Sequence, residues 1–291
     1  MSGPLPGETS DPEQRTLHNV AQIRLLTTGD IPAAMRLKDA AGWNQTEDDW
    51  RNVLRLAPDG CFAIDHEDRL AATATAVCFG RDVAWIGMVL TDPELRGRGY
   101  ARALMEHSMA YIEARGVAWM KLDATDMGRP LYLKLGFVDE APVERWRRAP
   151  GPMRGFEAGS PGPVPLDLDR EAFGADRSEL LRMLEKYASV ATAEGHAFAR
   201  PGSKATYLGP CVARTPEAAR SLLLSLARRH AFEPMFVDML PGNTQGTSLV
   251  RELGFERVRE LVRMARPGVS NPRPFVHRDE YVYAIAGFEY G

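Results

Sequence analysis

A glycine-rich turn holds the residue types best suited to bind a phosphate group. The sequence from Val89 to Ala101 joins an apolar run to a helical pattern that continues to about Arg115. The N-terminus of such a helix presents backbone N–H groups without carbonyl partners at the positive end of the helix dipole. Gly97 and Gly99 lack the Cβ atoms that would keep a pyrophosphate from the main chain, and neighbouring arginines add positive charge. The stretch predicts an anion site, although a plain strand-to-helix turn would use similar residues.

A second motif downstream helps to decide which class of protein the glycine-rich turn belongs to. The nucleotide-binding motifs do not fit, because the Gly-Lys-Ser/Thr of a Walker-type loop is absent and residues 97–102 lack the third glycine of a dinucleotide fingerprint. Further on, a tyrosine is followed at the right spacing by Gly-Phe. Together the two motifs resemble the GNAT superfamily of acetyl-CoA-dependent N-acetyltransferases over about residues 20–148. They read Arg96-x-x-Gly99-x-Ala101 and Tyr132-x-x-x-Gly136-Phe137.

The resemblance implies where acetyl-CoA would bind. In the family, the strand before the turn carries a bulge, and the pantetheine arm lies alongside it as a pseudo-strand. Gly87 is compatible with such a bulge, although it also suits an ordinary strand. The implied contacts are mostly main-chain ones, to pantetheine from the strand and to pyrophosphate from the turn. They come from Met88, Val89, Leu90, Arg96, Gly97, Arg98, Gly99, Tyr100 and Ala101.

Three side chains are candidates for proton transfer. The resemblance implies that Tyr132 protonates the departing thiolate, which suits a phenol with an ordinary pKa of about 10, although packing would also explain it. The strand at residues 84–90 has no carboxylate, so Asp123 is the first candidate for the general base and Asp126 the second. Either acid would also serve as a helix cap. Thr125 stands where many family members have asparagine, which weakens any claim about cofactor contacts from this loop.

The acceptor would lie against the segment between the first two strands, as the resemblance implies. Trp43 and Asn44 are the candidate acceptor-binding residues, with Trp50 nearby and the acids at 47–49 placed to attract an amine. The alternative is that the tryptophans belong to the core and the acids favour a helix N-terminus.

The elements needed to position these residues can be read in order. A short strand at 22–26, a helix from Asp30 to about Gly42 and a helix opened by a capping box at Thr46 come first. A hairpin over 61–79, a strand at 84–90, the helix after the turn and a strand at 117–122 follow. An antiparallel meander that feeds the phosphate-binding turn is the GNAT order.

The second half resembles a degenerate GNAT-like domain. Residues 248–255 repeat the form of residues 132–137, but Val250 takes the place of Tyr132, and the turn at 213–219 has lost its glycines. We expect no transfer chemistry there. Other expected elements are a helix at 178–187, strands at 195–200, 206–213 and 235–240, a helix from Thr215 and a closing strand at 281–288.

The fold class is therefore predicted as α/β (α+β), with two GNAT-like domains, each a mixed, mostly antiparallel central sheet flanked by helices. We expect a flexible arm over residues 1–19 and a catalytic domain over 20–149. A Gly/Pro-rich linker over 150–165 and the degenerate domain over 166–291 complete the chain.

The amino-acid composition of the chain limits the kinds of partner that it would bind. The 291-residue chain has 36 Lys and Arg against 39 Asp and Glu, a net charge of -3, which argues against a nucleic-acid binder with a basic surface. No apolar run is long enough to cross a membrane, and the first twenty residues lack a signal-peptide core. Three scattered cysteines, Cys61, Cys78 and Cys211, fit buried free thiols, and no metal site is expected. A cytoplasmic monomer or homodimer is the expectation.

The sequence thus favours an acetyl-CoA-dependent N-acetyltransferase. It would transfer an acetyl group to a primary amine of a small molecule or peptide by direct attack in a ternary complex, since no cysteine is placed as a covalent carrier. The alternative is a non-catalytic acyl-CoA-binding or regulatory module, for which the glycine-rich turn would suffice without a placed acid. A purely structural tandem fold ranks last, since it gives the residues at 96–99 no purpose.

Overall fold

The computed structural model describes residues 22–153 and 162–291. The predicted arm over residues 1–19 and residues 154–161 of the predicted linker lie outside this range. The division of the chain into domains at 149 and 166 therefore remains a prediction.

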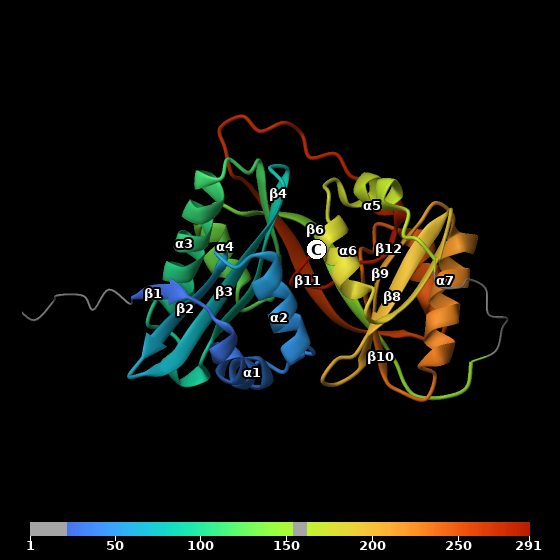
Figure 1. Cartoon of the computed structure of the whole chain (residues 1–291), viewed down its shortest axis with the longest axis horizontal. Helices are drawn as coiled ribbons and strands as arrows, with labels where there is room; N and C mark the ends of the chain where they lie inside the picture. The colour runs from blue at the N-terminus through green and yellow to red at the C-terminus, as the bar shows by residue number, and fades with distance from the viewer. Residues whose placement is uncertain (1–21, 154–161) are drawn as a thin grey trace, which may run out of the picture.

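One continuous sheet runs through both halves of the described chain (Figure 1). Its order is β1-β2-β3-β4-β5-β11-β6-β10-β9-β8-β7, with β12 beside β9. Among the described strands, only the pairs β4–β5 and β9–β10 are parallel, so the predicted mixed, mostly antiparallel sheet is confirmed. The strands are β1 (Ile23–Leu25), β2 (Cys61–His66), β3 (Arg69–Phe79), β4 (Val83–Thr91), β5 (Trp119–Ala124), β6 (Val138–Arg148), β7 (Ala188–Thr192), β8 (Gly195–Arg200), β9 (Thr206–Ala213), β10 (Met235–Met239), β11 (Glu256–Pro267) and β12 (Val282–Ala284).

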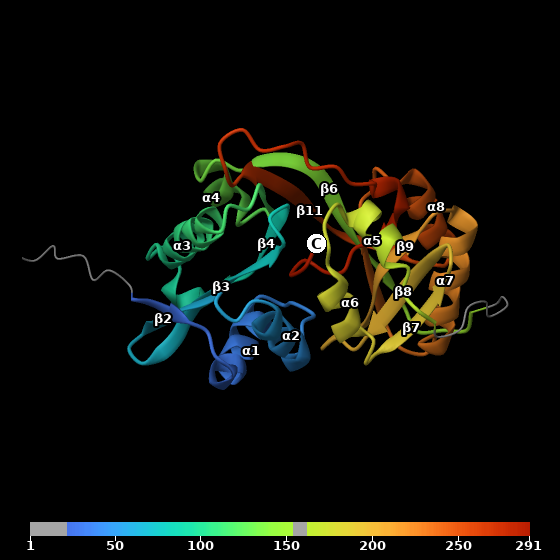
Figure 2. The same ribbon diagram turned by 45° about the horizontal axis from the view of Figure 1, so that its top comes forward.

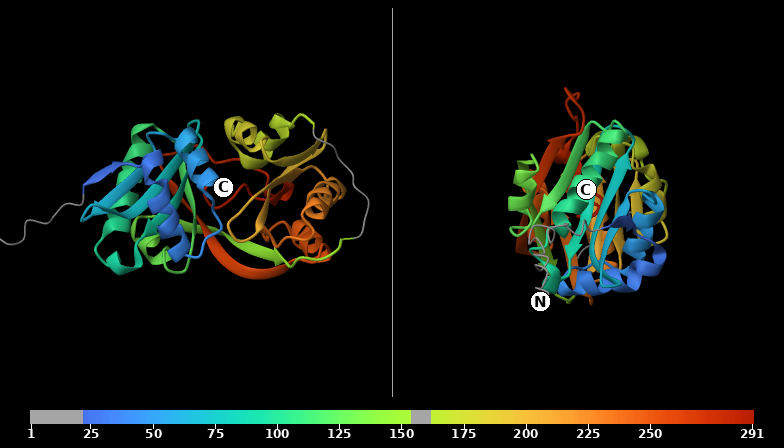
Figure 3. Two further views of the ribbon diagram at one scale, coloured as in Figure 1. Left: turned by 60° about the horizontal axis from the view of Figure 1, so that its bottom comes forward. Right: turned by 90° about the vertical axis from the view of Figure 1, so that its left-hand side faces the viewer.

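The two halves exchange their central strands. β11 of the second half pairs with β5 of the first, and β6 of the first half pairs with β10 of the second. β6 and β11 then pair with each other along their length, with Val143 opposite Leu261 near the middle. Both strands sweep from one half to the other (Figure 3). Each half therefore completes the sheet of the other.

Helices cover both faces of this sheet (Figures 1 and 2). One apolar cluster packs α1, α2 and α6 against one face, and a second packs α3 and α4 against the opposite face of the first half. A third packs α7 and α8 onto the second half. The helices are α1 (Ile31–Ala40), α2 (Glu47–Leu56), α3 (Tyr100–Ala114), α4 (Arg129–Lys134), α5 (Leu166–Phe173), α6 (Ser178–Leu184), α7 (Pro216–Arg229) and α8 (Thr244–Glu252), with short 3-10 turns η2 (Thr28–Asp30), η3 (Pro93–Leu95) and η4 (Asp279–Tyr281).

Local signals in the sequence place several of these boundaries correctly. The capping box at α2 is present, because the Thr46 side chain accepts from the Asp49 N–H and the Asp49 carboxylate accepts from the Thr46 N–H. Two predicted elements are shorter than expected: α6 ends at Leu184, and the closing strand spans only Val282–Ala284. Within residues 22–153 and 162–291, no helix is long and apolar enough to cross a membrane.

Candidate active site

The strand before the glycine-rich turn carries the predicted bulge. Thr73 of β3 lies opposite Leu90, and Thr75 lies opposite Gly87, so β4 has one more residue than β3 between these pairs. Met88 takes the extra position with a φ of 48°, and its carbonyl accepts a hydrogen bond of 2.7 Å from the Thr73 hydroxyl. β4 and β5 pair only from Val83 to Trp85, and the bulge lies just beyond this point. The two strands therefore splay apart where a ligand would enter between them.

The turn leads into an open helix N-terminus. Gly99 is the N-cap residue of α3, with a φ of 84°, and no side chain caps the helix. Gly97 has a φ of 79°, so both positions have the left-handed backbone that favours glycine. A Cβ atom added at either glycine would meet nothing within 4 Å. The N–H groups at the start of α3 therefore face a space that could take an anion.

A cavity of about 1040 Å³ joins the splayed strands to this turn. The β5–α4 loop, the α1–α2 loop, β6, β11 and the last residues of the chain complete its walls. Among the residues that the sequence suggests for the site, Arg98, Asn44, Trp50 and the acids at 47–49 do not line this cavity, and Trp50 belongs to the apolar core. Those that line it are Trp43, Met88, Val89, Leu90, Arg96, Gly97, Gly99, Tyr100, Ala101, Asp123, Asp126 and Tyr132.

Tyr132 lies on α4 with its side chain buried at the cavity wall. Burial raises the pKa of its phenol to about 12, so the hydroxyl remains protonated across the neutral range. The ring packs so closely on Gly128 that a Cβ there would lie 2.8 Å from the Tyr132 Cε2. Gly128 therefore fixes the place of the phenol.

Asp123 is bound in an ion pair. Both of its oxygens accept from Arg263 of β11, at 2.9 and 3.2 Å, and its side chain is 0% exposed. Burial raises the pKa of Asp123, and the Arg263 charge opposes this. Asp238 on β10 makes the equivalent pair with Arg145 of β6, at 2.7 Å. Because the same pair joins the exchanged strands in both halves, its first purpose is to hold the sheet together.

Asp126 follows β5 in the loop before α4, at the cavity wall, and its side chain is exposed. No hydrogen bond or ion pair engages its carboxylate among the described residues. Its charge acts on two nearby guanidinium groups, those of Arg259 and of Arg129, and Arg129 pairs with Asp139.

The two predicted acceptor residues have different surroundings. Trp43 lines the cavity, but the side chain of Asn44 is turned into a contact between the halves. Its Oδ1 accepts from the N–H groups of Lys204 and Ala205, and its Nδ2 donates to the Ala205 carbonyl at 3.0 Å. The amide oxygen and one N–H of Asn44 are thus engaged in the second half, and its side chain does not line the cavity. Gln45, the next residue, faces the cavity instead.

Arg98 and Tyr100 are anchored on the flank of the turn. The Tyr100 hydroxyl lies 2.9 Å from His66 Nδ1, and the Arg98 guanidinium lies 3.5 Å from His66 Nε2. His66 thereby connects the end of β2 to the turn. Tyr100 lines the cavity, whereas Arg98 does not.

The second half lacks both the open helix N-terminus and the gap between splayed strands. Thr215 caps α7 by accepting from the Ala218 N–H, so the helix N-terminus that corresponds to α3 is closed by its own side chain. β9 pairs with β10 only at residues 206–208, and β12 then pairs with β9 at Cys211 and Val212. The chain itself fills the gap that remains open between β4 and β5. Val250 is buried where the first half has Tyr132.

Several cavity residues were not predicted from the sequence. Gln45 comes from the α1–α2 loop, Arg145 and Arg259 come from the exchanged strands, and Phe288 and Glu289 come from the end of the chain. No local motif marks any of them, because only the fold brings them beside β4. Across the described residues, no group of three or more His, Cys, Asp or Glu side chains is arranged to hold a metal ion.

Comparison with known proteins agrees with this geometry. Two family models match the chain: the acetyltransferase (GNAT) family over residues 31–137 and the acetyltransferase (GNAT) domain over residues 166–284. The chain is also 32% identical over 133 residues to the [ribosomal protein bS18]-alanine N-acetyltransferase of Salmonella typhimurium, covering 42% of this chain and 84% of that protein.

Solved structures share the whole fold. A putative acetyltransferase from Pyrococcus horikoshii aligns with a TM-score of 0.82 at 22% identity, covering 94% of this chain and 96% of that one. A tandem GNAT protein from the clavulanic acid biosynthesis pathway aligns with a TM-score of 0.61 at 16% identity, covering 86% and 99%.

The fold and the site define a tandem acyltransferase, with one open site and one closed one. The chain belongs to the GNAT acetyltransferase family, with a GNAT domain in each half. This assignment favours the enzymatic hypothesis over a non-catalytic module.

Proposed function

We propose that the first half binds acetyl-CoA and transfers its acetyl group to a primary amine, by direct attack in a ternary complex. The observation that carries the proposal is the open N-terminus of α3 beside the splayed strands β4 and β5. In the second half, both features are closed by the chain itself. This contrast supports a single working site.

The residues present fit the cofactor. The bulged main chain of Met88, Val89 and Leu90 would pair with the pantetheine arm, and the N–H groups from Gly97 to Ala101 would hold the pyrophosphate. Arg96 adds charge at the wall of the cavity, with no ion pair among the described residues. Acetyl-CoA supplies an acetyl group already activated as a thioester.

The transfer requires two proton movements. As the amine nitrogen bonds to the acetyl carbon and the carbon–sulfur bond breaks, the nitrogen loses a proton and the sulfur gains one. Tyr132 would give its proton to the sulfur, because its phenol is protonated and faces the cavity. Of the two carboxylates predicted as bases, Asp126 is unpaired, whereas both oxygens of Asp123 are held by Arg263.

The acceptor would be a small-molecule or peptide amine. The Salmonella relative is named as acting on an alanine of a ribosomal protein, so an alanyl peptide is the first amine to include in a screen. The exchanged strands and the end of the chain line the acceptor side of the cavity here, so the acceptor need not be the same.

Calorimetric titration with acetyl-CoA tests the proposal. The intact protein should bind acetyl-CoA, and Gly99→Glu should weaken binding at least about tenfold, because it places a negative charge where the pyrophosphate would lie. Gly116→Glu is the matched control. Gly116 also has a positive φ and open space around it, but it lies at the other end of α3. If the intact protein does not bind acetyl-CoA, or if both variants bind equally, the proposed cofactor site is wrong.

A smaller change at Gly128 tests the position of Tyr132. Gly128→Ala would place a Cβ 2.8 Å from the Tyr132 ring, so the ring must move. We expect kcat to fall by about threefold to tenfold, a cost of roughly 1 kcal/mol, with acetyl-CoA affinity retained. Gly242→Ala, which meets nothing within 4 Å, is the control. Unchanged kcat in Gly128→Ala would argue against a placed phenol.

A further inference from the structure

Phe288 and Glu289, near the end of the chain, form part of the cavity wall beside β4. The end of the chain lies between the two halves (Figure 1). Trp85 of β4 donates its indole N–H to the Phe288 carbonyl at 3.1 Å, and Arg177 donates to the Gly291 carbonyl at 3.2 Å. A Cβ added at Gly87 would lie 3.0 Å from the Glu289 Cα. Glu289 is therefore held against β4 at the start of the bulge.

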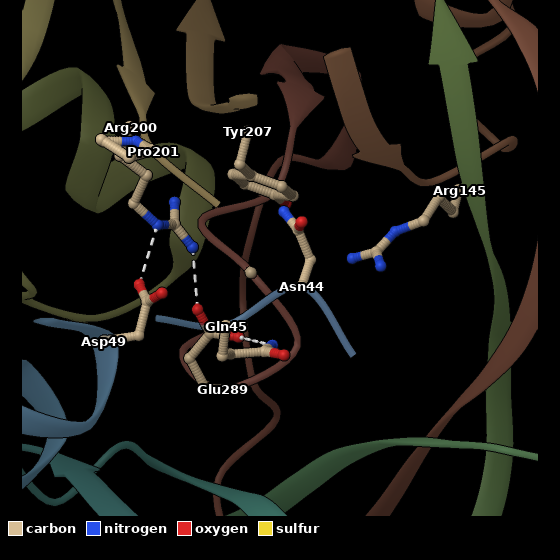
Figure 4. Close-up of a pocket in the computed structure, with 9 residues that line it drawn as sticks. Asn44, Gln45, Asp49, Arg145, Arg200, Pro201, Tyr207 and Glu289 are labelled. Atoms are coloured by element: carbon tan, nitrogen blue, oxygen red, sulfur yellow. Dashed lines mark hydrogen bonds and ion pairs between the residues drawn. The ribbon is translucent and has the colours of Figure 1, made fainter. Parts of the chain in front are cut away.

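The Glu289 carboxylate is oriented by residues from both halves (Figure 4). Arg200 of β8 donates to one oxygen at 2.8 Å, and Gln45 donates to the other at 2.8 Å. Arg200 also pairs with Asp49 of α2 at 3.1 Å. The Glu289 side chain cannot rotate freely, because each oxygen has a partner and the residue is only 1% exposed.

Gln45 has an unused acceptor. Its Oε1 is buried without a hydrogen-bond partner in the described structure, although Gln45 lines the cavity together with Glu289. A buried carbonyl oxygen of this kind costs free energy unless a donor reaches it. A bound amine would supply such a donor beside the carboxylate.

We propose that Glu289 is the proton acceptor for the incoming amine, and that Gln45 orients that amine through its free carbonyl oxygen. This inference rests on the proposed acetyl transfer. β4 itself has no carboxylate from residue 83 to residue 91. The end of the chain places the main chain of Glu289 against Gly87, and the Glu289 carboxylate is held by Gln45 and Arg200. The second half therefore contributes a reacting group to the site in the first.

The surroundings of Glu289 suit a base. Burial raises the pKa of its carboxyl group, while Arg200 opposes the rise and the Asp49 charge adds to it. The other groups that face this cluster are Tyr207, Tyr290 and Arg145. A pKa above the ordinary glutamate range brings the carboxylate closer to neutral pH, where a base is most effective.

Two protons move in the proposed step, and each has a donor and an acceptor. The amine nitrogen forms a bond to the acetyl carbon, its proton passes to a Glu289 oxygen directly or through one water, and the thiolate leaves with the proton of Tyr132. Glu289 then releases its proton to solvent, and Tyr132 regains one.

The test is the pH dependence of kcat/KM in Glu289→Gln and Glu289→Asp. It uses the best amine from a panel of primary amines that includes an alanyl peptide. If no amine on the panel reacts, the assay instead follows the slow hydrolysis of acetyl-CoA, in which water is the nucleophile. The intact protein should lose activity on the acidic side as Glu289 becomes protonated. Glu289→Gln should lower kcat/KM about tenfold to hundredfold and remove this acidic limb. Glu289→Asp should keep the limb with lower activity, because a carboxylate remains.

Asp49→Asn is the matched control. It breaks the other ion pair of Arg200, but Asp49 does not line the large cavity. It should therefore keep the acidic limb even if it lowers stability. If Glu289→Gln keeps the limb and the kcat/KM of the intact protein, the role of Glu289 is overturned while acetyl transfer stands. If the intact protein does not bind acetyl-CoA in calorimetry, the proposed function itself fails.

Discussion

Replacing Tyr132 with Phe is expected to lower kcat about 100-fold to 1000-fold and to leave acetyl-CoA affinity nearly unchanged. The substitution removes only the hydroxyl, and the phenyl ring keeps its packing on Gly128 and its edge contact with Phe137. In the described structure, no hydrogen bond engages this hydroxyl, so its loss should cost little stability. The lost function would be the donation of a proton to the departing sulfur, measured as kcat by thiol release.

The dependence of kcat on pH is a second test of the role of Tyr132. Burial raises the pKa of Tyr132 to about 12, so the phenol should remain a donor and give kcat no alkaline decline below about pH 11. Tyr111→Phe is the matched control, because burial raises the pKa of this tyrosine to about 12 as well, but it lies on α3 away from the cavity. Equal turnover in Tyr132→Phe and the intact protein would contradict the acid role of Tyr132. Binding of acetyl-CoA without any turnover in the intact protein would instead favour the non-catalytic acyl-CoA-binding module.

The geometry of the glycine-rich turn could be predicted because it is local in sequence. A strand, a bulge, a glycine-rich turn and a helix follow each other within residues 83–114, and their geometry depends on neighbours in the chain. Gly97 and Gly99 have the positive φ that their type suggests, and the N-terminus of α3 is open as expected. The same local reasoning explains why the helix that starts after Thr215 is capped by its own side chain.

The acceptor side could not be predicted, because its residues meet only through long-range contacts. Gln45 and Glu289 are 244 positions apart, and the sheet brings them to 2.8 Å. The strands β6 and β11 carry many charged residues, which hides the two-residue alternation typical of a strand. The buried charges on these strands find their ion-pair partners only when the two halves exchange β6 and β11, as in the pair of Arg145 with Asp238. A single sequence shows neither the exchange nor the pairs.

The contacts of the Asn44 side chain could not be predicted either. Its neighbours in the α1–α2 loop, Trp43 and Gln45, line the cavity. Its side chain nevertheless binds the main chain of residues 204–205 in the second half. Position in a motif indicates the region, whereas the direction of a side chain depends on partners far away in the sequence.

Breaking the Asp123–Arg263 pair should give the largest loss of stability. Arg263→Met would leave the Asp123 carboxylate buried without its partner, at a cost of about 3–5 kcal/mol in the free energy of unfolding. Arg266→Met is the control, because Arg266 lies on the same strand and pairs with Glu113, but both side chains are partly exposed. We expect about 1 kcal/mol or less for this pair. Denaturant unfolding of the two variants measures the difference.

The double variant Asp123→Leu with Arg263→Met separates structure from catalysis. Removing both charges should restore most of the lost stability, because an apolar pair no longer carries a desolvated charge. If Asp123 only joins the exchanged strands, the restored protein should also recover acetyl transfer and the acidic limb of its pH profile. If stability returns but the acidic limb disappears, Asp123 rather than Glu289 is the base, and the end of the chain serves to shape the cavity.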